Sequence, residues 1–234
     1  MEFSKRYIKD NIRDNLGRFE KLKPIILGND IIFQNAFRRI IDITNPTSLV
    51  ETGTYLGWTT EFFALEFPNI PIYTCETNKL YFKKAKKRLS NYKNVFVYNL
   101  SSPIFLKDLV NNNLLGDRPL FFLDAHWENE CPLKKELKII SNLNKTILVI
   151  HDFKVPNKQY FQFDSYNKQD LDINLLRVNL SEKNKYSIFF PNYPPTLIKK
   201  YLVGYVLVFQ NIPKYFNKIS KDNLFIKKFK QEKI

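Results

Sequence analysis

The fold is decided by one stretch, Ser48-Leu-Val-Glu-Thr-Gly-Thr-Tyr-Leu-Gly-Trp-Thr-Thr60. It begins as a short apolar run typical of a strand, turns at Gly53, and passes through Gly57 into a pattern typical of a helix. This strand, turn and helix order is typical of nucleotide-binding loops, in which glycines let the backbone approach a ligand closely. We therefore expect a ligand-binding loop here.

Strand and helix patterns alternate on both sides of this stretch. Short runs rich in branched and aromatic residues predict strands at 48–51, 72–75, 95–98, 120–123 and 146–150, and helical patterns lie between them at 58–67, 79–89, 103–111 and 132–142. Such alternation predicts an α/β fold with a mostly parallel, Rossmann-like sheet and helices on both faces. Two further strands at 186–190 and 202–209 are joined too closely for a crossover helix, so we expect an antiparallel final strand and seven strands altogether.

Length and composition suggest one domain with short extensions. The chain has 234 residues, of which 44% are apolar, enough for a sizeable core. We expect a helical extension at 1–45, the ligand-binding domain at 46–210 and a basic tail at 211–234. No apolar run has the length of a membrane span, and Cys75 and Cys131 lack metal-type spacing. The sequence is therefore interpreted as cytoplasmic.

The net charge of +14 raises the question of a polyanionic partner. Basic residues concentrate in two clusters, 79–93 and 214–233. A nucleic-acid surface is one interpretation of these clusters. The other is a solvated helix face, because the lysines of 79–89 lie opposite an apolar stripe.

Acidic residues follow several of the predicted strands. Glu51, Glu76, Asp124 and Asp152 all stand at carboxyl ends, where open α/β sheets bind ligands. Glu51 disfavours a diphosphate and suits a cationic or zwitterionic ligand. Glu76 is placed to accept hydrogen bonds from a ribose diol, so the pattern favours a nucleoside with an amino-acid group over a dinucleotide.

Two of these strand ends resemble a known family. Val50-Glu-Thr-Gly-Thr-Tyr-Leu-Gly57 is similar to the first motif of the class I S-adenosylmethionine-dependent methyltransferases, and Thr74-Cys-Glu76 to their second-strand acid. The resemblance implies that the glycine loop holds the methionine part of S-adenosylmethionine, Glu76 the ribose and the stretch after the third strand the adenine. The cofactor residues implied are Glu51, Thr52, Gly53, Thr54, Tyr55, Gly57, Thr59, Glu76, Asn99, Ser101 and Asp124.

A narrower resemblance concerns Phe122-Leu-Asp-Ala-His-Trp127 and Val149-Ile-His-Asp152. Both are similar to strand ends of metal-dependent small-molecule O-methyltransferases, in which carboxylates hold a magnesium ion that orients the acceptor hydroxyl. The resemblance implies a divalent metal, Mg²⁺ or Mn²⁺, bound by Asp124, His151 and Asp152. His151 departs from the family pattern, and a histidine moves the preference from magnesium toward manganese, iron or zinc.

Other roles for these residues stay open. His126 or His151 is suited to act as a metal-free general base, with Asp152 beside it, and the same polar residues also suit simple capping of strand ends. We expect an enzyme that methylates an oxygen of a small-molecule or glycan-like acceptor. The alternatives are an RNA or DNA methyltransferase that uses the basic surface and a non-catalytic binding module that retains the fold.

Overall fold

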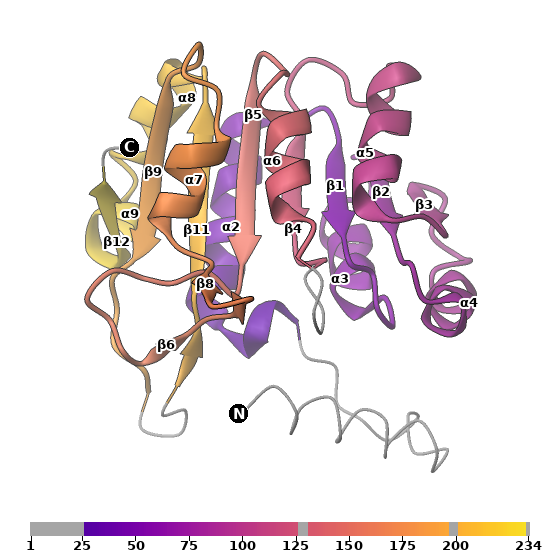
Figure 1. Cartoon of the computed structure of the whole chain (residues 1–234), viewed down its shortest axis with the longest axis horizontal. Helices are drawn as coiled ribbons and strands as arrows, with labels where there is room; N and C mark the ends of the chain where they lie inside the picture. The colour runs from indigo at the N-terminus through magenta and orange to yellow at the C-terminus, as the bar shows by residue number, and fades with distance from the viewer. Residues whose placement is uncertain (1–25, 126–130, 197–200, 233–234) are drawn as a thin grey trace.

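The protein is described by a computed structural model that covers residues 26–125, 131–196 and 201–232 (Figure 1). Its helices are η2 (Leu27–Asn29), α2 (Ile31–Thr44), α3 (Trp58–Glu66), α4 (Lys79–Arg88), α5 (Ser102–Asn111), α6 (Leu133–Ile140), α7 (Ile173–Asn179), α8 (Pro213–Ile219) and α9 (Asn223–Lys228). Its strands are β1 (Leu49–Thr52), β2 (Ile72–Cys75), β3 (Val95–Tyr98), β4 (Leu120–Leu123), β5 (Thr146–His151), β6 (Phe161–Gln162), β7 (Ser165–Tyr166), β8 (Gln169–Asp170), β9 (Tyr186–Pro191), β10 (Leu202–Val203), β11 (Tyr205–Gln210) and β12 (Phe229–Glu232).

The main sheet has the order β12-β9-β11-β5-β4-β1-β2-β3. Strands β1 to β5 are parallel to one another, whereas β11 is antiparallel to both β5 and β9. The predicted mixed, mostly parallel sheet is therefore confirmed. The predicted antiparallel pairing of the two late strands is also confirmed, since β11 pairs with β9. One detail differs, because the sheet has eight strands where seven were expected.

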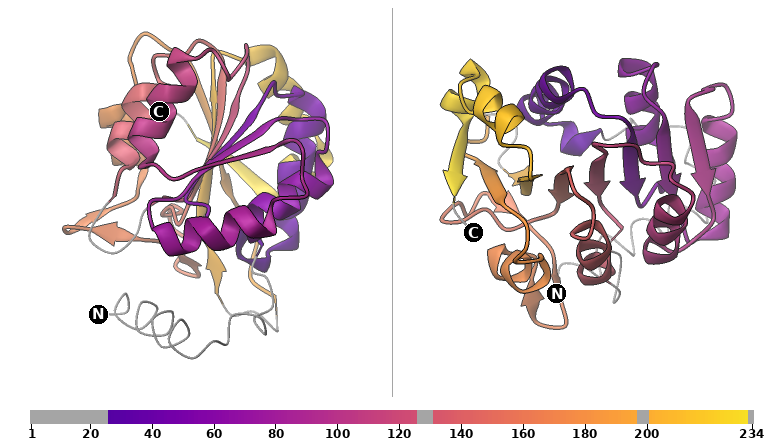
Figure 2. Two further views of the ribbon diagram at one scale, coloured as in Figure 1. Left: turned by 90° about the vertical axis from the view of Figure 1, so that its right-hand side faces the viewer. Right: turned by 90° about the horizontal axis from the view of Figure 1, so that it is seen from above.

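Helices cover both faces of this sheet (Figure 2). Figure 1 shows α5, α6 and α7 on the near face and α2 and α3 on the far face. The far layer is held together by side chains, since the ring of Phe37 on α2 stacks on Phe63 of α3 at 4.6 Å between centroids. The result is a three-layer α/β arrangement with one central sheet.

The centre of the sheet is apolar on both faces. All residues of β1, β4, β5 and β11 are buried, and most of them are Leu, Ile, Val or Phe. Strands that are covered on both faces have such continuous apolar runs instead of alternating patterns. This explains why short runs of the sequence were sufficient to locate them.

The helix α2 begins at a well-formed cap. Its N-cap residue Asp30 accepts hydrogen bonds from the backbone N–H groups of Ile32 and Phe33, at 2.9 and 3.2 Å. The other carboxylate oxygen of Asp30 accepts a bond from the hydroxyl of Tyr193 at 2.7 Å, and Tyr193 is bonded to the hydroxyl of Tyr205 at 2.9 Å. The start of α2 is therefore fixed to the strands behind it.

Residues 211–232, expected as part of a basic tail, form α8, α9 and β12. Strand β12 pairs antiparallel with β9 and adds the eighth strand. The ring of Phe229 stacks on Phe225 at 4.6 Å, and both lie near Phe189 of β9. Arg39 of α2 also forms an ion pair with Asp222, at 2.6 Å. These contacts join the segment to the core of the domain.

No helix in the described parts of the chain is long and apolar enough to cross a membrane.

Candidate functional site

The carboxyl ends of β1, β2, β4 and β5 meet at one edge of the sheet, as the parallel arrangement requires. In Figure 1 this edge faces downward, toward β6 and β8. All of the predicted site residues that the structure describes lie at or beside this edge. His126, predicted as a candidate base, lies outside the described residues.

The two glycines of the loop after β1 make contacts within the protein. Gly53 has a φ of +87°, and a Cβ there would overlap the carbonyl oxygen of Asp124. Gly57 has a φ of +81°, and a Cβ there would lie 3.4 Å from Ala85 of α4 and 3.2 Å from Leu89 at the end of that helix. Positive φ values favour glycine at both positions. Close packing against the end of β4 and against α4 therefore requires glycine at both positions. The close approach of a ligand to this loop stays a prediction.

Glu51 lies beneath this loop, with a side chain that is only 1% exposed. Its Oε2 accepts hydrogen bonds from the hydroxyls of Thr60 and, at 2.6 Å, Thr74. Thr54 in the loop is bonded to the same Thr74 hydroxyl at 2.5 Å. Burial raises the pKa of Glu51 to about 8, against the hydrogen bonds that favour its charged form. Glu51 thus links β1, β2, α3 and the loop through a buried polar chain.

Glu76 at the end of β2 faces the same loop. Its Oε2 accepts a hydrogen bond from the backbone N–H of Tyr55 at 2.8 Å, and its Oε1 accepts one from Asn78 at 2.8 Å. Burial raises the pKa of Glu76, although these two bonds oppose the shift. Each carboxylate oxygen has two lone pairs, so the acceptor capacity of Glu76 exceeds these two bonds. Asn99 after β3 joins the group by donating to the backbone oxygen of Glu76 at 2.6 Å.

The remaining predicted cofactor residues surround this pair of acids. Thr52 is buried at the end of β1, Thr59 lies half-buried in the first turn of α3, and Ser101 precedes α5 as its N-cap. Tyr55 has a left-handed backbone, with a φ of +50°. Its ring lies 6.4 Å from that of Trp58, which the guanidinium of Arg88 covers at 5.6 Å.

Asp124, His151 and Asp152 converge at the ends of β4 and β5. Nδ1 of His151 lies 3.2 Å from Oδ1 of Asp124 and 3.4 Å from Oδ2 of Asp152. One possible ligand atom from each residue lies within 4.8 Å of those of the other two. Two carboxylate oxygens and one imidazole nitrogen are a donor set that binds divalent metal ions. The predicted metal ligands therefore fit such an ion.

The imidazole of His151 is enclosed by aromatic rings. It lies nearly parallel to Phe33 at 6.2 Å between centroids and 5.7 Å from Phe122. Its Nε2 is buried and has no hydrogen-bond partner among the described residues. Burial alone would lower the pKa of His151, but Asp124 and Asp152 together raise it well above 6.5.

Asp152 is held by the segment that follows it. Its φ of +51° is uncommon for a residue other than glycine. Its carbonyl accepts a hydrogen bond from the N–H of Asp164 at 2.9 Å, and the next residue, Phe153, donates to Gly204 at 2.9 Å. A Cβ on Gly204 would overlap the carbonyl oxygen of Phe153, so the chain passes very close to β5 here. The uncommon backbone conformation is therefore fixed by its neighbours.

Solved structures with this arrangement of strands bind the methyltransferase product S-adenosylhomocysteine. An O-methyltransferase from Bacillus cereus in complex with S-adenosylhomocysteine covers 89% of this chain and is covered to 90%, with 15% identity and a TM-score of 0.55. The plantazolicin methyltransferase BpumL, also bound to S-adenosylhomocysteine, covers 88% of this chain and is itself covered to 89%. Its sequence identity is 12% and its TM-score is 0.51. The chain has the fold of the class I S-adenosylmethionine-dependent methyltransferases.

A third structure with this methyltransferase fold is a candidate caffeoyl-CoA O-methyltransferase from Staphylococcus aureus. It covers 88% of this chain, is itself covered to 99%, and has 14% identity and a TM-score of 0.52. Comparison of the sequence with protein-family profiles and with curated proteins gives no match. At these identities the likeness concerns the fold.

The roles of several residues around the site were not predicted from the sequence. Thr60 and Thr74 hold Glu51, and Phe33 with Tyr205 packs behind His151. No pattern in the sequence indicates contact between Phe33 and a histidine 118 positions later. For Thr74, the available signal was its position two residues before Glu76, the second-strand acid.

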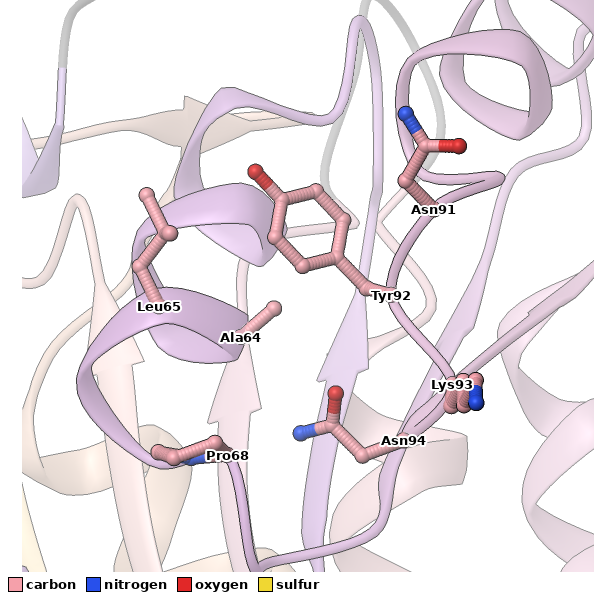
Figure 3. A pocket seen from close by; sticks show the side chains of 7 residues that line it. All are labelled: Ala64, Leu65, Pro68, Asn91, Tyr92, Lys93 and Asn94. Atoms are coloured by element: carbon pink, nitrogen blue, oxygen red, sulfur yellow. The ribbon is translucent and has the colours of Figure 1, made fainter.

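A surface hollow of about 470 Å³ lies at the other edge of the sheet, near the starts of β2 and β3 (Figure 3). Its walls contain none of the predicted site residues. Two of the polar side chains there are engaged within the protein: Asn94 donates to the carbonyl groups of Phe67 and Ile70, and Tyr92 donates to Glu61. These bonds connect α3 and the segment after it to the start of β3.

Proposed function

We propose that this protein is an S-adenosylmethionine-dependent methyltransferase that acts on an oxygen of a small-molecule acceptor. One observation carries the proposal: Gly53 of the predicted cofactor loop lies directly against Asp124 of the predicted acceptor site. Transfer of a methyl group is an in-line displacement, so donor and acceptor sites must adjoin. The O-methyltransferase structures with the same fold support the choice of oxygen as the acceptor atom.

In this proposal the cofactor lies along the glycine loop. Glu76 accepts hydrogen bonds from the ribose hydroxyls, while its existing bond to the N–H of Tyr55 holds the loop against the end of β2. Asn99 and Ser101 flank the adenine. Glu51 acts from beneath, through Thr74 and Thr54, and keeps the loop in shape without itself entering the ligand surface.

The acceptor half of the site is formed by Asp124, His151 and Asp152. These three residues would hold a divalent cation, which supplies orientation of the acceptor oxygen and lowers the pKa of its hydroxyl. The chain itself orients the ligand atoms. Hydrogen bonds hold the backbone of Asp152, and aromatic rings hold the imidazole of His151.

The geometry does not favour His151 as a free general base. Its Nδ1 already lies between two carboxylates, and its Nε2 points into the buried interior. Without a bound cation, the carboxylates of Asp124 and Asp152 would be able to take up a proton from the acceptor.

Calorimetry with S-adenosylhomocysteine tests the cofactor proposal. The native protein is expected to bind it with one-to-one stoichiometry and to bind a dinucleotide such as NAD⁺ much more weakly. Absence of S-adenosylhomocysteine binding by folded protein would overturn the proposal. Binding without methyl transfer to any of a panel of phenols, catechols and sugars would instead favour a non-catalytic binding module.

A further inference from the structure

The direction of the His151 ring determines what the acceptor-side trio offers to a metal ion. The ring is 7% exposed and has neighbours on both sides, Phe33 at 6.2 Å and Phe122 at 5.7 Å. Phe33 and the ring are almost parallel, with an angle of 13° between their planes. Of the two ring nitrogens, only Nδ1 faces the carboxylates of Asp124 and Asp152.

Phe33 is itself held in place from behind. Its ring stacks on Tyr205 at 3.7 Å between centroids, with an angle of 9° between the planes. The hydroxyl of Tyr205 is bonded to Tyr193, and Tyr193 donates to Asp30, the N-cap residue that also fixes the backbone N–H of Phe33. The start of α2 and the strand β11 therefore form one rigid backing for the imidazole.

The backbone of Asp152, the third residue of the trio, is equally restricted. Asp152 has a left-handed backbone, and its carbonyl is bonded to the N–H of Asp164 at 2.9 Å. Asp164 also accepts a hydrogen bond from the hydroxyl of Tyr166 at 3.0 Å. Two oxygens and one nitrogen thus arrive from fixed backbone positions, with little freedom to rearrange into an all-oxygen shell.

Such a donor set discriminates between metal ions. Mg²⁺ prefers oxygen ligands in a near-octahedral arrangement and retains much of its water. An imidazole nitrogen instead favours first-row transition metals, whose affinities for a given site rise from Mn²⁺ to Cu²⁺. Zn²⁺ sites with three protein ligands commonly include histidine and carboxylate together.

We propose that the trio Asp124, His151 and Asp152 is selective for a first-row transition-metal dication over Mg²⁺, and that Phe33 is the positioning residue that keeps Nδ1 of His151 aimed at the ion. The inference rests on the proposed methyltransferase function for what the ion does, but its binding is measured independently of that function.

The test uses the full chain freed of metal by a chelator and then titrated with MnCl₂ or MgCl₂ in a calorimeter. Electron paramagnetic resonance of free Mn²⁺ gives a second readout of binding. The native protein is expected to bind Mn²⁺ more than about tenfold tighter than Mg²⁺. Equal affinity for the two ions, or no binding of Mn²⁺, would overturn the proposal.

Three variants separate ligand chemistry from packing. His151→Asp supplies an all-oxygen set and is expected to reduce the ratio of Mn²⁺ to Mg²⁺ affinity several-fold. Phe33→Leu is expected to weaken Mn²⁺ binding while leaving Mg²⁺ binding nearly unchanged. The control Phe105→Leu alters an equally buried ring on α5 that does not contact His151, and both affinities should stay at the native values.

Two outcomes would contradict individual parts. An unchanged ratio in folded His151→Asp would remove the imidazole from the selectivity argument, and equal losses for both ions in Phe33→Leu would reduce Phe33 to a merely structural residue. Titration of the same samples with S-adenosylhomocysteine separates this inference from the function on which it rests. Failure of that ligand to bind overturns the cofactor proposal, whereas the metal preference is decided by the ion titrations alone.

Discussion

The backbone of Gly53 lies against the carbonyl group of Asp124, so closely that any β-carbon at position 53 would overlap the carbonyl oxygen. This contact joins the predicted cofactor loop to the predicted acceptor site. The side chain of the same Asp124 lies 3.2 Å from His151. A single residue thus borders both halves of the proposed site, and its position is sensitive to changes in either one.

Gly53→Ala should therefore be more harmful than the same change at Gly57. Both glycines have positive φ, which costs alanine about 1–2 kcal/mol. Only position 53 faces an immovable backbone group, and the overlap should add about 1–3 kcal/mol. Urea denaturation of both variants measures the difference, and S-adenosylhomocysteine affinity should fall further for Gly53→Ala. Equal losses of stability would contradict the contact with Asp124.

Glu76→Gln should weaken cofactor binding while preserving the fold. The change removes the charge from a carboxylate that already holds the N–H of Tyr55. Loss of a charged hydrogen bond costs about 1.5–3 kcal/mol, so the dissociation constant of S-adenosylhomocysteine should rise about 10- to 100-fold. Glu182→Gln, at an exposed position after α7, is the matched control. A native affinity in Glu76→Gln would refute the ribose assignment.

Glu51→Gln should flatten the dependence of stability on pH. In the folded protein the pKa of Glu51 is about 8, against 4.5 for an ordinary glutamate. Its stabilising contribution is fully present below pH 4.5 and is lost as the pH rises toward 8, because the folded state retains a proton that the unfolded chain releases. The free energy of unfolding should fall by up to about 1.4 kcal/mol per pH unit in this window.

The Gln variant lacks this titration, so its stability relative to the native protein should increase from pH 5 to pH 8. Glu66→Gln provides the control, since the pKa of Glu66 is lowered by Arg38 and the group is largely solvated. Parallel pH profiles for native protein and Glu51→Gln in urea denaturation would argue against a buried, proton-retaining carboxyl.

Tyr193→Phe should destabilise the protein by about 1–3 kcal/mol, because it leaves the buried carboxylate of Asp30 and the hydroxyl of Tyr205 without their shared partner. Tyr160→Phe removes the hydroxyl of a half-buried tyrosine for which the described residues offer no hydrogen bond, and it should be nearly neutral. Thermal unfolding distinguishes the two. A neutral Tyr193→Phe would mean that the start of α2 is held by packing alone.

Phe229→Ala should cost about 3–5 kcal/mol, the usual range for emptying the site of a buried ring. The ring packs on Phe225 and against Phe189, and it joins β12 to the core. Phe96→Ala, on the opposite edge strand β3, removes a ring that is 43% exposed and should cost much less. Similar losses would indicate that residues 229–232 contribute little to the sheet.

The central strands could be predicted from sequence because burial on both faces makes them continuously apolar. The order of β9 and β11 could not, because pairing partners on either side of an apolar strand look alike in sequence. Strand β12 was missed for another reason. Its residues Phe-Lys-Gln-Glu include one apolar side chain, which suffices for an edge strand because only one point of it needs to enter the core.

For the site, the rule that carboxyl ends of parallel strands meet was sufficient to bring Asp124, His151 and Asp152 together. The same rule does not predict which side chains surround these residues. Contact between Phe33 and His151 depends on how α2 docks on the sheet, and the inward direction of Glu51 depends on threonines from two other elements. Local sequence patterns carry no information about such docking.

The position of Trp58 has a practical consequence for spectroscopy. Its indole is one of two in the chain, lies beside Tyr55 of the glycine loop and is covered by the guanidinium of Arg88. Indole emission responds to nearby charges and to changes in solvent contact. A Trp127→Phe background would leave Trp58 as the single emitter, so that loop occupancy becomes an optical signal readable without labels or a known acceptor.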